Sequence, residues 1–121
     1  MDFQLDRSKT VCFSGHRPEK LPCGGDDDAV VIKALKSMLS KMVIDSINEG
    51  YDCFITGCAK GIDLWAGNIV LNERTRFKDK DIKLIAAMPY KGHGAGFKGY
   101  DKWLLGNILN KAHRIYYTGE S

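Results

Sequence analysis

Short apolar runs alternate along the chain with longer stretches in which apolar residues recur every three to five positions. The short runs predict four strands, at residues 10–14, 51–56, 82–88 and 114–118. The longer stretches predict three helices, one between each strand and the next. Regular alternation of strand and helix is typical of an α/β fold with a parallel sheet. We therefore expect a Rossmann-like three-layer sandwich with about four strands in the order βαβαβαβ.

The first predicted helix lies between three aspartates and a glycine. Asp26, Asp27 and Asp28 precede it, where carboxylates complement the positive N-terminal end of a helix. Gly50 stands where glycine commonly follows the last helical turn. We expect one apolar face to pack on the sheet, formed by Val31, Leu35, Met38, Leu39, Met42 and Ile47.

Length and composition fit one globular domain over residues 1–121. Apolar residues make up 44% of the chain, which excludes a disordered polypeptide. The longest apolar run, at residues 84–88, is far shorter than the roughly 20 residues of a membrane span. Residues 1–10 lack the apolar segment of a secretory signal. We expect a cytoplasmic protein that has no membrane partner.

The charge balance is mild, with 18 basic and 15 acidic residues and a net charge of +3. The excess lies in residues 61–121, which carry 10 basic and 6 acidic side chains. This half of the chain tolerates an anionic ligand. It lacks the dense Lys and Arg cluster of an electrostatic nucleic-acid site, so we expect no nucleic-acid partner.

The cysteines and tryptophans are expected to be structural. Cys12, Cys23, Cys53 and Cys58 do not form the spaced pairs of a zinc site, so we expect no metal. Cys12 and Cys53 fall inside apolar runs and are predicted to be buried. Trp65 and Trp103 fall on predicted helices, where we expect them to serve packing rather than to form a ligand cage.

The first candidate motif, at residues 14–22, directly follows the first predicted strand. Gly15 permits a tight turn and the close approach of a ligand. Arg17 offers a charged donor fork for phosphate or carboxylate, and His16 offers a hydrogen bond or a proton. Glu19 is suited to accept from a hydroxyl or to orient Arg17. The alternative interpretation is an ordinary surface loop with an Arg–Glu pair.

The second motif, Gly57-Cys58-Ala59-Lys60-Gly61-Ile62-Asp63, joins the second strand to a helix. Two glycines at such a turn let backbone N–H groups face outward beside the positive helix end, which suits an anion. Asp63 is suited either to cap the helix or to hold a ribose hydroxyl or another loop. The spacing is neither the dinucleotide fingerprint nor the phosphate loop of nucleotide triphosphatases.

The third motif, Pro89-Tyr90-Lys91-Gly92-His93, follows the third predicted strand and opens a glycine-rich loop at residues 92–99. Tyr90 is suited to stack on a planar ring, and Lys91 or His93 to contact an anion. The alternative is a solvent-facing loop with a partly buried tyrosine. All three motifs follow strands, where parallel sheets bind their ligands.

Taken together, the motifs resemble the YpsA/YoqJ-like family of bacterial proteins. This family belongs to the SLOG superfamily, with the LOG phosphoribohydrolases and the Smf/DprA proteins. The resemblance rests on CFSGHRPEKLP at residues 12–22, FITGCAKGID at residues 54–63 and PY at residues 89–90. It implies a Rossmann-like domain that binds a nucleotide or nucleotide-derived ligand, such as ADP-ribose or an NAD-related molecule. The binding residues it implies are Gly15, His16, Arg17, Glu19, Gly57, Ala59, Lys60, Gly61, Asp63, Pro89 and Tyr90.

The chain also departs from the family's pattern. His93 stands where the family usually has glutamine, and residue 121 precedes the family's Arg-Asn segment and Gly-Gly-Thr turn. The glycine-rich motif of LOG enzymes, with its glutamate, is absent. We therefore expect a C-terminally shortened domain that binds or senses its ligand without catalysis and without a required cofactor.

Two other functions remain open, together with an expected partner. A hydrolase of an N-glycosidic or phosphate bond would use Glu19 or Asp63 as its acid–base group. A module like the DprA relatives would bind nucleic acid or protein. The fourth strand, with no further element after it, predicts a bare sheet edge, so we expect a homo-oligomer.

Overall fold

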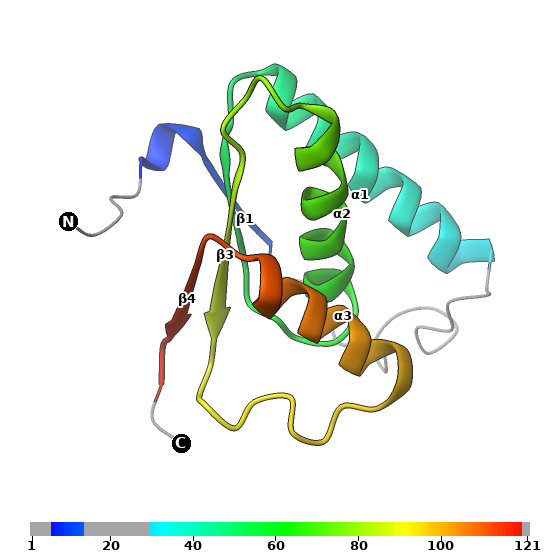
Figure 1. Ribbon diagram of the computed structural model, residues 1–121. Coiled ribbons are helices and arrows are strands. Elements are labelled where there is room, and N and C mark those ends of the chain that lie inside the picture. Colours follow the sequence, from blue (N-terminus) through cyan, green and yellow to red (C-terminus); the bar gives the residue numbers. More distant parts are fainter. Residues whose placement is uncertain (1–5, 14–29, 120–121) are drawn as a thin grey trace.

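The computed structural model describes residues 6–13 and 30–119 of the chain (Figure 1). A 3₁₀ turn at Arg7–Lys9 precedes the first strand. The elements that follow are β1 (Thr10–Phe13), α1 (Val30–Asn48), β2 (Cys53–Thr56), α2 (Ile62–Arg76), β3 (Lys83–Met88), α3 (Gly99–Lys111) and β4 (Arg114–Tyr117). The predicted α/β fold, with its three helices and four strands, is confirmed.

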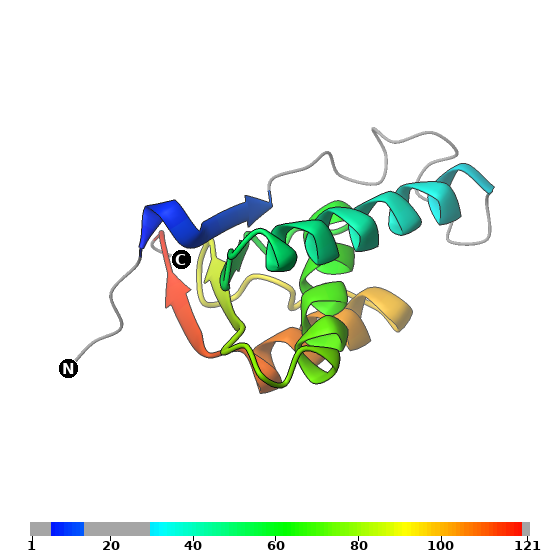
Figure 2. The same cartoon turned by 90° about the horizontal axis from the view of Figure 1, so that it is seen from above.

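The four strands form one parallel sheet in the order β1-β2-β3-β4. Each strand therefore pairs with the next one along the chain. Figures 1 and 2 show α1, α2 and α3 side by side on one face of this sheet, as expected when successive crossovers have the same hand. The described residues thus form two layers, the sheet and the helices on one of its faces, whereas we expected a sandwich of three layers.

The core lies between the sheet and the helices. Phe54 of β2 and Leu84 of β3 are opposite each other and fully buried, and Ala86 and Met88 continue the same face of β3. Helix α2 lies between α1 and α3 and covers the middle of the sheet. Its position explains why α2 is buried around most of its circumference, whereas α1 and α3 each bury one side.

The buried face of α1 differs from the predicted one. Met38 and Met42 are exposed, at 61% and 55%, and Val31 is also exposed. Of the predicted residues, Leu39 and Ile47 are buried and Leu35 packs against the core, and Ile32 and Val43 complete the buried face. The buried face is therefore rotated from the predicted one by less than the roughly 100° of one residue. Both stripes are apolar at helical spacing, so hydrophobicity alone does not choose between them.

The expectations for Gly50, for two cysteines and for the two tryptophans can be compared with the structure. Gly50 follows α1 with φ of 104°, as predicted, and donates its N–H to the Ile47 carbonyl. Trp65 and Cys53 are buried, also as predicted. Cys12 is exposed, so its predicted burial was wrong. Trp103 is 60% exposed, and its ring stacks on Tyr100. Trp103 points away from the sheet-facing side of α3, and Cys12 lies on the sheet face opposite the helices. The expected caps Asp26, Asp27 and Asp28 lie outside the described residues.

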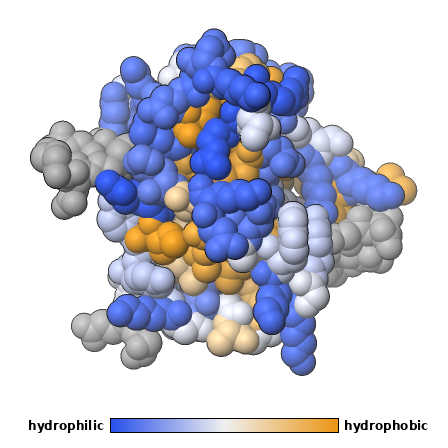
Figure 3. Space-filling model, viewed as in Figure 1, coloured by the Kyte–Doolittle hydropathy of each residue, from blue (hydrophilic) through white to orange (hydrophobic). Residues whose placement is uncertain are grey.

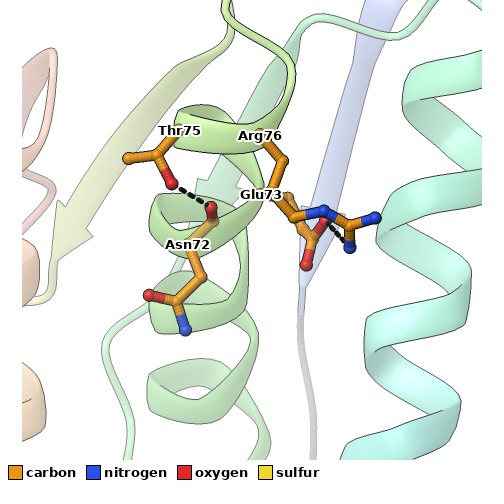
Figure 4. Close-up of polar contacts among 4 residues, drawn as sticks. All are labelled: Asn72, Glu73, Thr75 and Arg76. Atoms are coloured by element: carbon orange, nitrogen blue, oxygen red, sulfur yellow. Dashed lines mark hydrogen bonds and ion pairs between the residues drawn. The ribbon is translucent and has the colours of Figure 1, made fainter.

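The C-terminal end of α2 is fixed by local polar contacts (Figure 4). Arg76 Nη1 lies 2.9 Å from Oε1 of the buried Glu73, one helical turn away. Thr75 Oγ1 donates to the Asn72 carbonyl at 2.7 Å. The Phe77 N–H donates to the Glu73 carbonyl and closes the last turn. These contacts belong to the end of α2 remote from the strand ends discussed next.

The helix layer also contains a buried polar link. Asn68 Nδ2 donates to the Leu104 carbonyl at 3.1 Å, and Asn107 Nδ2 donates to Asn68 Oδ1 at 2.7 Å. These bonds fix α3 against α2 and so fix where the loop before α3 lies.

Within residues 6–13 and 30–119, no helix combines the length and apolar character required to cross a membrane.

Candidate functional site

The second and third motifs meet at one edge of the sheet. The turn that follows β2 and the loop that follows β3 both begin where neighbouring parallel strands end. A hydrogen bond joins them, because His93 Nε2 lies 2.8 Å from the Cys58 carbonyl oxygen. A carbonyl oxygen only accepts, so Nε2 carries the proton in this contact. The second and third motifs therefore lie side by side at this sheet edge.

The turn between β2 and α2 is organised by buried polar groups. Thr56, the last residue of β2, donates from Oγ1 to the Asp63 carbonyl at 2.7 Å and accepts the Cys58 N–H at 3.3 Å. Asp63 is 6% exposed, and its Oδ2 accepts the Ala59 N–H at 3.3 Å. The strand end and the first helical turn thus hold the intervening backbone in one shape.

Crowding at one position and backbone conformation at another explain the two glycines of this turn. A Cβ on Gly57 would lie 2.8 Å from Asp63 Oδ2, so any side chain there displaces the carboxylate. Gly61, directly before α2, has φ of 89°, a conformation that favours glycine. Cys58 has φ of 64°, which is uncommon for a residue with a side chain and marks a constrained turn.

Asp63 holds the turn through both its side chain and its main chain. Its carboxylate accepts the Ala59 N–H, and its main chain accepts from Thr56. These contacts hold the turn that precedes α2. A buried carboxylate committed to a backbone N–H is suited to positioning the turn.

Cys58 lies inside the turn, and its thiol has low reactivity. Its side chain is fully buried, and burial, reinforced by the nearby Asp63 carboxylate, raises the pKa of the thiol to about 12. Burial also raises the pKa of the Cys53 thiol. Since the thiolate is the reactive and metal-binding form, neither cysteine is suited to nucleophilic or metal chemistry near neutral pH. Among the described residues, no group of three or more His, Cys, Asp or Glu side chains is placed to hold a metal ion.

A cavity of about 520 Å³ opens between the turn and the loop. Ala59 and Lys60 line it from the turn, and Tyr90 and residues 92–97 line it from the loop. Lys60 Nζ lies 5.1 Å from the centre of the Phe97 ring, within cation–π range. The cavity therefore combines a positive charge, aromatic surface and glycine backbone.

The loop is shaped by an aromatic cluster around His93. The His93 ring meets the edge of Tyr90, with ring centres 5.7 Å apart, and the edge of Phe97, with centres 5.2 Å apart. Gly94 has φ of 89°, and a Cβ there would overlap the Leu105 side chain of α3. The loop therefore packs tightly against α3 at one glycine, while His93 fastens it to the turn.

The residues predicted from sequence lie in the cavity lining, in the turn beside it and directly after β3. Ala59, Lys60 and Tyr90 line the cavity, whereas Gly57, Gly61 and Asp63 shape the turn beside it. Pro89 directly follows β3, before the residues that line the cavity. Gly15, His16, Arg17 and Glu19 lie outside the described residues, so their role stays a prediction.

Sequence reasoning missed two residues of this site. Phe97 was read only as part of a glycine-rich loop, yet its ring contacts both His93 and Lys60. Gly94 was not distinguished from its neighbouring glycines. An aromatic residue that interrupts a run of glycines is a signal that identifies Phe97, whereas the contact of Gly94 with α3 required the fold.

Comparison with known proteins identifies relatives of this chain. Two matching relatives are the UPF0398 proteins of Staphylococcus haemolyticus and of Staphylococcus epidermidis, each 26% identical over 117 residues. The alignment covers 92% of this chain and 61% of each of those proteins. A UPF0398 protein of Staphylococcus aureus is 25% identical over 107 residues, which cover 88% of this chain and 56% of that protein.

The chain thus spans about three fifths of the length of the curated relatives that it matches. A family-level match covers a similar share of this chain. The YspA SLOG family, designated YpsA, matches residues 11–121, which include both motifs at the cavity. Because this match extends over most of the sequence, the chain belongs to the YspA SLOG family.

Proposed function

We propose that this chain binds an anionic, nucleotide-like ligand where the β2 turn meets the β3 loop. The observation that carries the proposal is the cavity of about 520 Å³, which brings Lys60 and Tyr90 together beside the N-terminal end of α2. Ligand pockets of a few hundred Å³ that combine apolar walls with a few convergent polar groups are typical of small-molecule sites. Membership of the SLOG family supports the same class of ligand.

Each part of the cavity matches a different part of such a ligand. Lys60 supplies a cation for a phosphate group, and the N-terminal end of α2 adds a partial positive charge behind the turn. The Tyr90 ring is 42% exposed and offers a face on which a base can stack. The turn is held from beneath by Thr56 and Asp63, so its backbone is organised before a ligand arrives.

The contacts of Asp63 favour binding over hydrolysis as the task of this turn. An acid–base group must reach the reacting proton, whereas the Asp63 carboxylate is 6% exposed and accepts a backbone N–H. We therefore assign Asp63 a positioning role in the proposed site. Glu19, the other carboxylate considered from sequence, lies outside the described residues.

Calorimetric titration with ADP-ribose, NAD and common mononucleotides tests the proposal. We expect one of these ligands to bind and Lys60→Ala to weaken binding by about tenfold, the cost of one charge-assisted hydrogen bond. Binding to the unsubstituted chain should also weaken as salt concentration rises, and this dependence should be shallower in Lys60→Ala.

A matched control is Lys102→Ala, which removes an exposed lysine from α3, outside the cavity. This variant should bind as tightly as the unsubstituted chain. An absence of heat with every ligand, both for this chain and for a longer UPF0398 relative, would contradict the proposal. Equal loss of affinity in the two lysine variants would show that the cavity is not where the ligand binds.

A further inference from the structure

Strand β4 ends the described sheet and is exposed along its whole length. Ile115, Tyr116 and Tyr117 are 36%, 44% and 47% exposed. Natural edge strands are usually blunted by lysine, proline or a bulge, because unpaired backbone groups invite another strand. Residues 115–117 contain none of these devices and consist of residue types that favour strands.

The helix-facing side of β4 is also uncovered. Ile115 is opposite Ala86 and Tyr117 is opposite Met88, and both partners on β3 belong to the buried core. Helix α3, which follows β3, packs over β3, with Leu109 partly buried at its margin. Figure 3 shows hydrophobic residues at the surface over β4 and beside α3. Ile115 and Tyr117 thus extend the apolar face of the sheet beyond the part that α3 covers.

We propose that β4 pairs in antiparallel fashion with β4 of a second copy of this chain. A two-fold axis perpendicular to the sheet keeps the helices of both copies on the same side. Directly opposite residues must then share a face, which restricts the register. Centring the pair on Tyr116 places Ile115 opposite Tyr117 of the second copy, and the converse.

This register is self-complementary in both packing and charge. It forms two pairs of a β-branched and an aromatic residue on the helix side and one tyrosine pair on the other side, combinations that stabilise antiparallel strands. Arg114 comes opposite Thr118, so no like charges face each other across the pair. The match of this strand with itself, in both residue types and charge, is the argument for a second copy of this chain over an unrelated partner.

The paired strands would also cover the exposed core-type side chains. Ile115 and Tyr117 of both copies would lie together between the two α3 helices, beside Leu109. Transient complexes typically bury less than about 1,200 Å² in total, and a pair of strands as short as β4 (Arg114–Tyr117) makes a small interface. We therefore expect a weak dimer that dissociates in the micromolar range.

Sedimentation velocity from low to high micromolar concentration tests the dimer. We expect a monomer–dimer equilibrium that the double variant Ile115→Lys/Tyr117→Lys shifts at least tenfold toward monomer. The matched control is Trp103→Lys, which charges an aromatic residue that is 60% exposed on α3. It should leave association unchanged, and circular dichroism checks that both variants are folded. A monomer at every concentration, or association unaffected by the β4 lysines, would overturn the proposal.

A disulfide tests the register and remains informative if the lysine variant fails to fold. Opposite residues in an antiparallel pair have Cα atoms about 4.5–5.5 Å apart, within the range that a disulfide bridges. In a Cys12→Ser/Cys23→Ser background, Tyr116→Cys should form a covalent dimer on mild oxidation. Arg114→Cys alone should not, but mixed with Thr118→Cys it should form a heterodimer. Equal cross-linking by all three single variants, or none by Tyr116→Cys, would overturn the proposed register.

Discussion

The turn after β2 and the loop after β3 lie at the same sheet edge but are built differently. The turn spans five residues and is held from inside by Thr56 and Asp63, with Cys58 fully buried within it. The loop spans ten residues and is shaped by contacts among the rings of Tyr90, His93 and Phe97. The turn presents backbone, whereas the loop presents side chains.

This difference suggests a division of work within the proposed site. A fixed turn can place N–H groups and a helix end against an anion without reorganisation on binding. A loop with exposed rings can contact the variable, planar part of a ligand. The two parts are joined by the hydrogen bond from His93 to the Cys58 carbonyl and by the contact of Lys60 with the Phe97 ring.

The largest effect should come from removing the carboxylate that holds the turn. Asp63→Ala leaves the Ala59 N–H without its acceptor inside the turn, and we expect a loss of about 2–3 kcal/mol in the free energy of unfolding. Urea denaturation measures this loss. Asp101→Ala, which removes an acidic residue from the first turn of α3, serves as the control and should cost less than about 1 kcal/mol. Equal losses in the two variants would show that Asp63 has no special role.

The loop should be sensitive at one glycine and tolerant at another. In Gly94→Ala the new Cβ meets Leu105 and the backbone has φ of 89°, so we expect a loss of about 1–3 kcal/mol. Gly96→Ala, whose Cβ would meet nothing within 4 Å, should be nearly neutral. Thermal denaturation of the two variants compares them directly. A neutral Gly94→Ala would mean that the loop does not pack on α3 as described.

The link between the two regions can be broken with less effect on stability. His93→Phe keeps a ring between Tyr90 and Phe97 but removes the hydrogen bond to Cys58, so we expect a loss of about 1 kcal/mol. Hydrogen exchange should become faster at the amides of residues 92–97. Lys91→Ala, at an exposed neighbouring position, should leave exchange unchanged. Unchanged exchange in His93→Phe would contradict the proposed link.

A last effect should appear only at alkaline pH and should originate inside the turn. Burial raises the pKa of the folded Cys58 thiol to about 12 from its ordinary value of 9.0. The stabilisation is therefore complete below about pH 9 and is lost as the pH rises toward 12, by at most about 1.4 kcal/mol per pH unit. Urea midpoints between pH 8 and 10.5 should fall more steeply for the unsubstituted chain than for Cys58→Ala. Parallel pH profiles would exclude the thiol as the cause.

Sequence predicted the arrangement of the site better than its contacts. Strand–helix alternation placed Lys60 and Tyr90 after the ends of strands, and the structure brings both to one cavity. The bond from His93 to the Cys58 carbonyl was not predictable, because it depends on the positive φ of Cys58. A carbonyl carries no sequence signal, and its direction is set by the backbone of a turn.

The helix faces show the same limit. Met38 and Val43 are both apolar residues at helical spacing, yet Val43 is buried and Met38 is exposed. Which of two adjacent stripes faces the sheet is decided by the packing of α1 beside α2, a tertiary relationship that periodicity does not encode. Trp103 follows this rule as well, since its place on a helix did not reveal which side of α3 it occupies.

The central claim is that turn and loop together form one ligand site, and an NMR titration of backbone amides with ADP-ribose, followed by NAD, tests it most directly. The account predicts concerted shift changes at residues 57–63 and 90–97, with the outer side of α3 and the α2 end at Glu73 unchanged. Spectra that do not change at millimolar ligand, or changes confined to only one of the two segments, would contradict it.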